Sequence, residues 1–267
     1  MNQSEVHRAP WADDSLTATV KVLRVLESVA RRGECGVADV LTFTGMPKST
    51  VVRMLSTLVE EGFLERPGQN RYRPALKLWE MGCSAVRWDD VREVVYPSLK
   101  RLVSETNETA HYAVYDHGRA VYVEKVDGSH PVRAYTTVGG SSPAQATATG
   151  KALLAWRPEH EMRSLLADAR PYTASSITSG SDFVAAAEQI RHQGYAANRG
   201  EWRSGVWGIA APVFDRHVEV VGAVGVSGPA ERIEDQLERY AFHVVEAARA
   251  LSRRFGARAS AGQQSVS

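Results

Sequence analysis

A short basic segment carries the side chains of this chain that are best suited to contact a nucleic acid. Lys48, Ser49 and Thr50 directly follow Pro47, and Arg53 comes one helical turn later with no acidic residue among them. Near a helix N-terminus, such side chains can contact phosphate oxygens and base edges in a major groove. The alternative for this segment alone is a plain helical hairpin with a solvated basic face.

Two apolar-periodic segments predict the helices that would position these side chains. Val37–Phe43 and Val51–Val59 both place apolar residues at helical spacing. Between them, Gly45 is typical of a helix end and Pro47 of a helix start. The segment therefore predicts a helix–turn–helix.

A preceding helix and a basic β-hairpin are predicted on either side of this motif. The helix is expected to begin at a Ser15 cap and to end at Arg31–Gly33. Phe63–Glu65 and Arg71–Arg73 are expected to form short strands around the turn Pro67–Asn70. This order is typical of a winged helix and favours DNA binding over the plain hairpin. The wing side chains expected to contact phosphate or the minor groove are Arg66, Arg71 and Arg73.

Two later segments resemble catalytic or phosphate-binding motifs, but each departs from the pattern. Thr149–Ala152 resembles the end of a phosphate-binding loop, yet Gln145 replaces its first glycine and Ala152 its Ser or Thr. Gly225–Pro229 resembles a nucleophile elbow, yet Pro229 replaces the second glycine. The eight histidines form no recognisable metal-binding set. We therefore expect no enzymatic activity, no cofactor and no metal.

The same region is better suited to bind a small molecule. Thr147–Lys151 offers hydroxyls and backbone N–H groups at a predicted helix start, which favours a carboxylate or similar anion. Small residues along two predicted strands would leave space above a sheet: Gly205, Gly208, Gly222, Gly225, Ser227 and Gly228. Polar and aromatic groups nearby in sequence are Asn198, Arg199, Trp202 and Arg203. The alternative is that the glycines serve only strand packing and turns.

Composition is that of a globular protein long enough for two domains. The 267 residues are 43% apolar and 24% charged, with a net charge of +1, so any DNA-binding charge must be local. No apolar run approaches the ~20 residues of a membrane span, and the N-terminus lacks the apolar core of a signal peptide. Cys35 and Cys83 stand without metal-binding spacing and indicate a reducing cytoplasm. We expect a cytoplasmic protein without a membrane partner.

Five parts are predicted along the chain: a mobile arm (1–14), the winged helix (15–75), a linker helix (76–90), a second domain (91–256) and a disordered tail (257–267). Pro97 is expected to kink or restart the first helix of the second domain. Strands are then expected at 111–115, 120–126, 132–138, 195–198, 205–214 and 218–227. Helices are expected at 150–156, 159–167, 182–193 and 231–255. This mixture favours an α+β fold, with an antiparallel sheet flanked by helices, of the kind used in sensor domains.

Over about residues 16 to 255 the chain resembles the IclR family of bacterial transcriptional regulators. The segments that carry the resemblance are KVLRVLESVA, STVVRMLSTLVEEGFLER, ATATGKALLA, IRHQGYAANRGEW and GIAAPVFDRHVEVVGAVGVSGP. The resemblance implies an N-terminal winged helix–turn–helix, a linker helix and a C-terminal GAF-like effector-binding domain. It also implies homodimers or homotetramers that bind palindromic DNA operators and respond to small metabolites, commonly organic or aromatic acids.

By position, the resemblance transfers family effector contacts to Ala134, Ser142, Ala148, Thr149, Asn198, Val206, Gly208, Gly225 and Ser227. Asn198 occupies a position where some relatives have an acidic residue, and this neutral side chain would make the pocket more favourable for anions. Gly208 and Gly225 stand where relatives can carry Cys and Ser, which would widen the pocket. Val218 replaces a glycine common in its turn.

Together these observations predict a regulator whose effector shifts the relative placement of its domains through the linker helix. Two alternatives remain open. One is an enzyme in which residues 110–255 carry catalysis and the DNA-binding domain is regulatory. The other is a regulator that binds DNA independently of any ligand.

Overall fold

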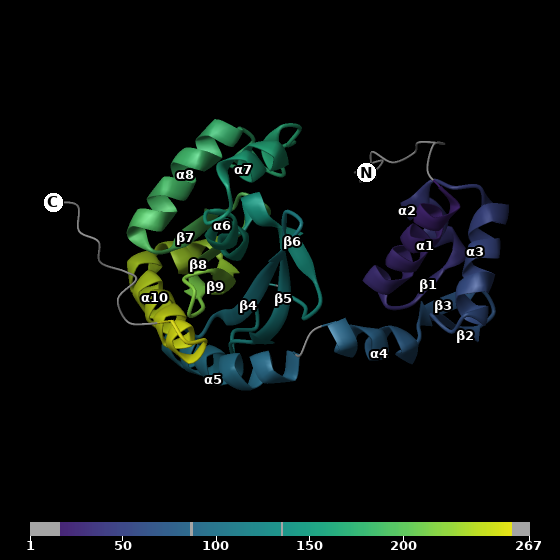
Figure 1. Cartoon of the computed structure of the whole chain (residues 1–267), viewed down its shortest axis with the longest axis horizontal. Coiled ribbons are helices and arrows are strands. Elements are labelled where there is room, and N and C mark those ends of the chain that lie inside the picture. The colour runs from purple at the N-terminus through teal and green to yellow at the C-terminus, as the bar shows by residue number, and fades with distance from the viewer. Residues whose placement is uncertain (1–16, 86–87, 135, 258–267) are drawn as a thin grey trace. The chain divides into compact units, whose positions relative to one another are not determined.

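The chain divides into two units between residues 87 and 88. The structure is a computed structural model that describes residues 17–85, 88–134 and 136–257 (Figure 1). The predicted mobile arm, and the predicted tail from residue 258 onward, therefore lie outside the described residues. Among the helices that the structure describes, none combines the length and apolar character needed to cross a membrane.

The core of the N-terminal unit contains α1 (Ala18–Arg32), α2 (Val37–Thr44) and α3 (Lys48–Glu60). They pack around a core that includes Val25, Val29, Val40, Val51, Leu55 and Leu58. Thr17 caps α1 by accepting a hydrogen bond from the Val20 N–H, while the predicted cap, Ser15, lies outside the described residues. Gly45 ends α2 in the left-handed conformation, as its position in the sequence predicts.

A three-stranded antiparallel sheet, in the order β1-β3-β2, completes this unit. Its strands are β1 (Cys35–Gly36), β2 (Leu64–Gly68) and β3 (Arg71–Pro74). The hairpin is longer than predicted, because Pro67 and Gly68 belong to β2. Only Gln69 and Asn70 remain as the turn, with Asn70 at φ +60°. Strand β1 has no sequence signal, since two residues are too few to show alternation. Helix α4 (Leu76–Ala85) follows.

The second unit is built on a six-stranded antiparallel sheet in the order β6-β5-β4-β9-β8-β7. Its strands are β4 (Thr109–Asp116), β5 (Arg119–Val126), β6 (Ser141–Pro143), β7 (Ala196–Arg199), β8 (Val206–Phe214) and β9 (Val220–Pro229). One face packs on α5 (Trp88–Thr106) and α10 (Leu237–Arg254). The other face packs on α6 (Ala148–Leu154), α7 (Glu159–Leu166) and α8 (Gly180–Gln193) (Figure 1). The predicted α+β class with an antiparallel sheet is therefore confirmed.

The strand predicted at 132–138 is wrong for its described residues, 132–134 and 136–138, which form no strand. The residues that pair with the outer edge of β5 come later: Ser141 and Ser142 of β6 lie opposite Val121 and Ala120. Just before β6, the Gly139 N–H donates to the Tyr122 carbonyl and the Tyr122 N–H donates to the Gly140 carbonyl. These contacts pair the outer edge of β5, from Arg119 to Tyr122, with residues 139–143, which follow the predicted segment.

Two helix predictions also need correction. The closing helix expected at 231–255 is two helices, α9 (Ala230–Glu234) and α10, separated at Asp235 and Gln236, because Gln236 is not helical (φ −120°, ψ 14°). Helix α5 begins at Trp88 and continues through Pro97, so of the two predicted alternatives, a kink or a restart, the restart is wrong. Leu99 and Leu102 after the proline are fully buried, and this packing offsets the one backbone hydrogen bond that Pro97 cannot make.

The β8–β9 turn holds a valine in a conformation that favours glycine. Val218 has φ +65° and an exposed side chain. The turn is stabilised by Asp215, whose carboxylate accepts hydrogen bonds from the His217 and Glu219 N–H groups. A β-branched residue in the left-handed region is strained, so this turn stores unfavourable energy in the folded state.

We predict that Val218→Gly raises the stability of the second unit by about 1 kcal/mol, because relief of the strain exceeds the added flexibility of the unfolded chain. Scanning calorimetry of the full chain should show a higher Tm for this unit. Val220→Gly, in regular strand conformation two residues later, is the matched control and should lower the Tm. A lower Tm for both variants would contradict the strain argument.

Candidate functional site

Helix α3 separates an apolar buried side from a polar exposed side. Its buried residues are Val51, Met54, Leu55 and Leu58. Lys48, Ser49 and Arg53 are exposed, and Thr50 is half-buried at the edge of the same face. The predicted DNA-contacting residues of α3 therefore share one accessible surface.

The N-terminus of α3 also offers unpaired backbone donors. Pro47 occupies the cap position without a side-chain cap, and the first backbone bond of the helix runs from the Val51 N–H to the Pro47 carbonyl. The N–H groups of Lys48, Ser49 and Thr50 therefore have no partner within the helix. No acidic residue lies in the first turn. This end of α3 thus presents positive charge and donors to an anion such as a DNA phosphate.

The wing arginines are exposed, and each already has a neighbour. Arg71 Nε lies 2.9 Å from Glu34 Oε1, and Arg73 Nη2 lies 2.7 Å from Glu65 Oε2. The Arg66 guanidinium lies 5.8 Å from the centre of the Tyr72 ring. Exposed ion pairs of this kind contribute only about 0–1 kcal/mol, so exchanging a carboxylate for a phosphate costs little.

The second unit encloses a cavity of about 40 Å³ between the sheet and the start of α6. Among the residues placed by family resemblance, those that line it are Ala134, Ala148, Thr149, Asn198, Val206, Gly208 and Ser227. The remaining lining residues are His111, Tyr122, Thr136, Thr147, Trp202, Arg203 and Val226. The structure thus brings together segments that are far apart in the sequence.

Ser142 and Gly225 are not part of the lining. The Ser142 hydroxyl lies behind it, 3.0 Å from Tyr122 OH and 3.1 Å from Thr147 Oγ1. Gly225 lies where β9 passes close to β8: a Cβ there would come 2.5 Å from the Ile209 carbonyl oxygen. The absent side chain at Gly225 therefore permits close strand packing and does not widen the cavity.

Three polar groups of the lining have no partner. His111 Nδ1, Thr149 Oγ1 and Ser227 Oγ are buried and make no hydrogen bond within the described residues. Buried polar groups are normally paired, and leaving one unpaired costs about 1–3 kcal/mol. Such a concentration of unpaired groups around one cavity is typical of a site that binds a polar ligand.

The charge at the cavity comes from Arg203. Burial lowers the pKa of His111 to about 4, so this imidazole is neutral at pH 7. Arg203 is exposed at the cavity, with its guanidinium 4.5 Å from the centre of the Trp202 ring. It makes no ion pair within the part of the chain that the structure describes. The cavity therefore combines a neutral polar interior with one available cation.

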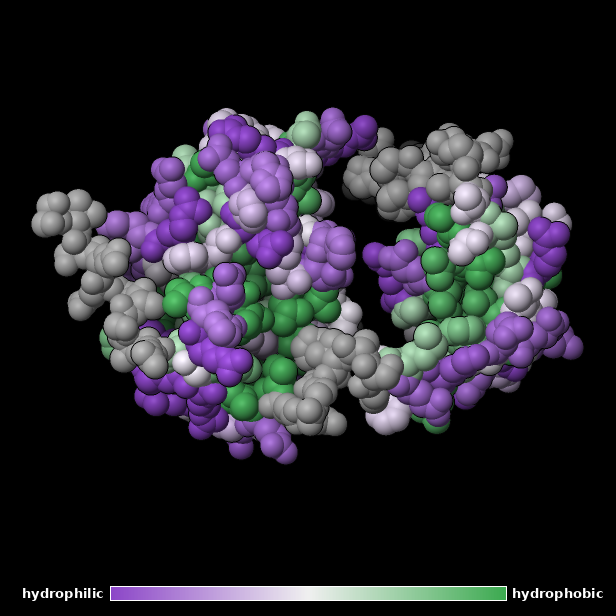
Figure 2. Space-filling model, in the orientation of Figure 1, coloured by the Kyte–Doolittle hydropathy of each residue, from purple (hydrophilic) through white to green (hydrophobic). Residues whose placement is uncertain are grey.

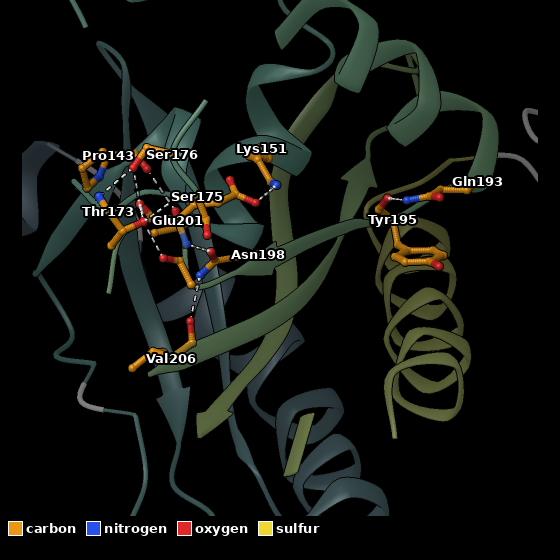
Figure 3. A network of polar contacts seen from close by, with 12 residues as sticks. Pro143, Lys151, Thr173, Ser175, Ser176, Gln193, Tyr195, Asn198, Glu201 and Val206 are labelled. Carbon is orange, nitrogen blue, oxygen red and sulfur yellow. Dashed lines mark hydrogen bonds and ion pairs between the residues drawn. The ribbon is translucent and has the colours of Figure 1, made fainter. Parts of the chain in front are cut away.

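A buried network anchors the segment that carries Trp202 and Arg203 (Figure 3). Lys151 Nζ lies 2.5 Å from Glu201 Oε1, and both side chains are more than 90% buried. The Glu201 N–H donates to Asn198 Oδ1, and its carbonyl accepts from the Ser176 hydroxyl. Burial lowers the pKa of Lys151, against the opposing effect of Glu201.

Because of this network, the anion-binding site predicted at Thr147–Lys151 differs from the expectation. Lys151 is outside the lining and is committed to Glu201. Thr147 occupies the cap position of α6, but its hydroxyl donates to the Pro143 carbonyl instead of capping the helix. Only Thr149 of this segment offers the cavity an unpaired hydroxyl.

The lining residues that sequence reasoning missed are His111, Tyr122, Thr136 and Val226. His111 and Tyr122 lie on neighbouring strands, with their rings 5.0 Å apart in an edge-to-face arrangement. Both occupy positions that alternation assigns to one face of the sheet. Strand alternation was therefore the available signal. No such signal applies to Thr136, because it lies in the segment 132–138, where the predicted strand does not form at the described residues.

The low pKa of His111 predicts a specific pH dependence. Its folded pKa of about 4 lies below the unfolded value near 6.5, so between these values only the unfolded state gains a proton. The second unit should therefore lose up to about 3 kcal/mol of unfolding free energy as pH falls through this window. His111→Phe should remove this part of the pH dependence in denaturant unfolding. The exposed control His160→Gln should retain it, and identical slopes in all three proteins would contradict the assignment.

The Lys151–Glu201 pair predicts non-additive mutations. Lys151→Met leaves a buried carboxylate uncompensated and should cost about 3–5 kcal/mol of unfolding free energy, measured by denaturant titration. Lys151→Met/Glu201→Leu should recover most of the loss, because neither charge remains buried. The control is Arg163→Met at the exposed Arg163–Glu159 pair, which should change stability by less than about 1 kcal/mol. A double variant no more stable than the single would contradict the argument.

Two family models match this chain. The IclR helix-turn-helix domain matches residues 18–68, and the bacterial transcriptional regulator IclR C-terminal model matches residues 83–253. The first match covers the exposed basic face of α3, and the second covers every residue that lines the cavity.

Similar proteins agree with both matches. The HTH-type transcriptional regulator KdgR of Escherichia coli is 32% identical over 247 residues, covering 91% of this chain and 94% of its own length. The crystal structure of the Thermotoga maritima IclR has a TM-score of 0.66 at 29% identity, covering 89% of this chain and 98% of that one. An IclR homologue from Microbacterium hydrocarbonoxydans, crystallised with 4-hydroxybenzoate, shares the fold with a TM-score of 0.75 at 23% identity, covering 90% and 99%. This chain belongs to the IclR family of DNA-binding transcriptional regulators.

Proposed function

We propose that this chain is a cytoplasmic, homo-oligomeric regulator that binds a palindromic operator and changes its DNA binding when a small organic acid occupies the cavity. The observation that carries the DNA-binding part is the exposed face of α3. There Lys48, Ser49 and Arg53 surround unpaired backbone N–H groups with no acid in the first turn. Phosphate contacts would set the register of α3, and Arg53 would contact base edges.

Support for a small acid comes from the cavity. Its interior holds unpaired polar groups on His111, Thr149 and Ser227, and Arg203 supplies positive charge without a carboxylate partner in the described chain. Asn198 adds a neutral side chain where some relatives have an acid, so no carboxylate of the lining would repel an anion. A ligand containing a carboxylate and further polar atoms would satisfy these groups.

Support for oligomers comes from helix α4. Leu76 and Trp79 expose 64% and 67% of their surface, which is unusual for large apolar residues unless a partner covers them. Figure 2 shows hydrophobic residues gathered on the visible face of the N-terminal unit, with hydrophilic residues at its edge. We propose that α4 belongs to a linker in each copy of the chain. Through this linker, effector binding would bias the spacing between the DNA-binding units of two copies.

An enzymatic role is not part of this proposal. KdgR of Escherichia coli, to which this chain is similar, is a transcriptional regulator. The polar groups of the cavity also lack the pairing of nucleophile and base on which covalent catalysis depends, since His111 makes no hydrogen bond to a hydroxyl of the lining within the described residues.

The recognition-helix assignment predicts different effects for Arg53→Ala and Lys48→Ala. The DNA is a duplex selected from a random library by the wild-type chain, and affinity is measured by fluorescence anisotropy. Arg53→Ala should weaken binding about 10- to 100-fold and relax preference at one base pair of each half-site. Lys48→Ala should weaken all sequences similarly and reduce the salt slope by about 0.9 for each phosphate that is no longer neutralised.

The matched control is Arg249→Ala, an exposed arginine of α10 paired with Glu246, which should leave affinity and preference unchanged. If Arg53→Ala also leaves both unchanged, α3 does not read the operator as proposed.

A further inference from the structure

A chain of buried hydroxyls lies directly behind the cavity. Tyr122 OH is 3.0 Å from Ser142 Oγ, Ser142 Oγ is 3.1 Å from Thr147 Oγ1, and Thr147 Oγ1 is 3.1 Å from the Pro143 carbonyl oxygen. All three hydroxyl-bearing side chains are at least nine-tenths buried. Tyr122 and Thr147 line the cavity, whereas Ser142 does not.

The donor and the acceptor of each hydrogen bond in this series of hydroxyls follow from its last acceptor, the Pro143 carbonyl. A carbonyl oxygen can only accept, so Thr147 donates its single hydroxyl proton to Pro143. Thr147 must then accept from Ser142, which uses the only proton of Ser142. Ser142 must in turn accept from Tyr122. The Tyr122 hydroxyl therefore has no proton left, and it presents only acceptor lone pairs to the cavity.

Because the Tyr122 hydroxyl can only accept a hydrogen bond from a ligand, it favours some ligand groups over others. A ligand hydroxyl can donate to Tyr122 and complete its hydrogen bonding. A ketone or ether oxygen at the same place has no proton to donate, so two sets of lone pairs would face each other. The unpaired hydroxyls of Thr149 and Ser227 can rotate to donate or to accept, so they tolerate either group.

Arg203 offers the ligand hydrogen-bond donors, whereas Tyr122 offers an acceptor. A guanidinium has only donors and a permanent positive charge, and it suits a carboxylate. The cavity thus offers an acceptor at Tyr122 and a cation at Arg203, with the neutral His111 ring packed edge-to-face against Tyr122. A ligand that matches both carries a hydroxyl and a carboxylate.

The volume limits the size of this ligand. The cavity measures about 40 Å³. For comparison, an apolar cavity of about 150 Å³ holds a benzene ring. An aromatic acid would require a large expansion of this cavity, whereas a short aliphatic acid requires a small one.

We propose that the effector is a short aliphatic hydroxycarboxylic acid of roughly two to four carbons, whose hydroxyl donates to Tyr122 and whose carboxylate pairs with Arg203. Ser142 is then a positioning residue, because it fixes Tyr122 as an acceptor without touching the ligand. This inference rests on the proposed role of the cavity as the effector site.

The test compares matched acids that differ only in the group facing Tyr122. Titration calorimetry of the full chain uses lactate, propionate and pyruvate, then 3-hydroxybutyrate, butyrate and acetoacetate, and finally 4-hydroxybenzoate and benzoate. In the two aliphatic sets, the hydroxy acid should bind about tenfold or more tightly than its deoxy and keto counterparts, because only it satisfies the Tyr122 acceptor. Tighter binding of either aromatic acid than of both aliphatic hydroxy acids would overturn the size argument.

Two variants test the direction of the hydroxyl chain. Tyr122→Phe should abolish the preference for hydroxyl over deoxy acids. Ser142→Ala removes the acceptor of the Tyr122 proton, so Tyr122 can donate into the cavity, and the preference for hydroxy over keto acid should fall at least severalfold. The control is Ser141→Ala, whose hydroxyl accepts from Arg119 Nε and takes no part in the chain. It should keep the wild-type preference.

The outcomes separate this inference from the proposed function. Equal or tighter binding of keto or deoxy acids by the wild-type chain overturns the hydroxy-acid proposal, as does binding of no acid in the panel. An unchanged preference in a folded Ser142→Ala variant overturns the role of the hydroxyl chain. Operator binding of the ligand-free chain, measured by anisotropy on the same preparations before any acid is added, tests the regulator proposal separately, and its absence would count against that proposal alone.

Discussion

The buried ion pair between Lys151 and Glu201 is the interaction on which the architecture of the cavity depends. It joins helix α6 to the segment after strand β7, fifty positions later in the chain. Glu201 lies next to Trp202 and Arg203, which line the cavity, and Lys151 lies two residues after Thr149, which also lines it. Since breaking such a pair leaves a buried charge, the two walls cannot separate without a large cost.

Two glycines allow helix α6 to pack closely against its neighbours on this side of the sheet. A Cβ at Gly150 would come 2.4 Å from the Ala144 backbone, so only glycine lets α6 follow the short helical turn at Ala144–Ala146 so closely. A Cβ at Gly208 would lie 3.6 Å from the Ala148 Cβ, which shows how near the start of α6 comes to strand β8. Gly208 and Ala148 both line the cavity, so this close approach of β8 and α6 limits its size.

The sequence predicted features that depend on local chemistry better than those that depend on distant partners. Periodicity with Gly45 and Pro47 located the helices of the DNA-binding unit, since caps and apolar spacing act within a few residues. The alternation of apolar residues at 132–138 resembles that of a strand, yet its described residues form none, and the outer edge of β5 pairs with residues 139–143 instead. The Lys151–Glu201 pair and the Arg71–Glu34 contact likewise join residues that only the fold brings together.

The two sites use electrostatics in opposite ways. On α3, Lys48 and Arg53 are exposed, so the attraction for phosphate that we propose for them would be long-ranged and screened by salt. Around the cavity, burial keeps His111 neutral and Lys151 is compensated by Glu201, so the selection proposed for this cavity depends mainly on hydrogen-bond direction. A hydrogen bond of fixed direction is short-ranged and only weakly sensitive to ionic strength. On the roles proposed for α3 and the cavity, salt would weaken both DNA binding and the pairing of the ligand carboxylate with the exposed Arg203, whereas the choice between hydroxy and keto acids would change little.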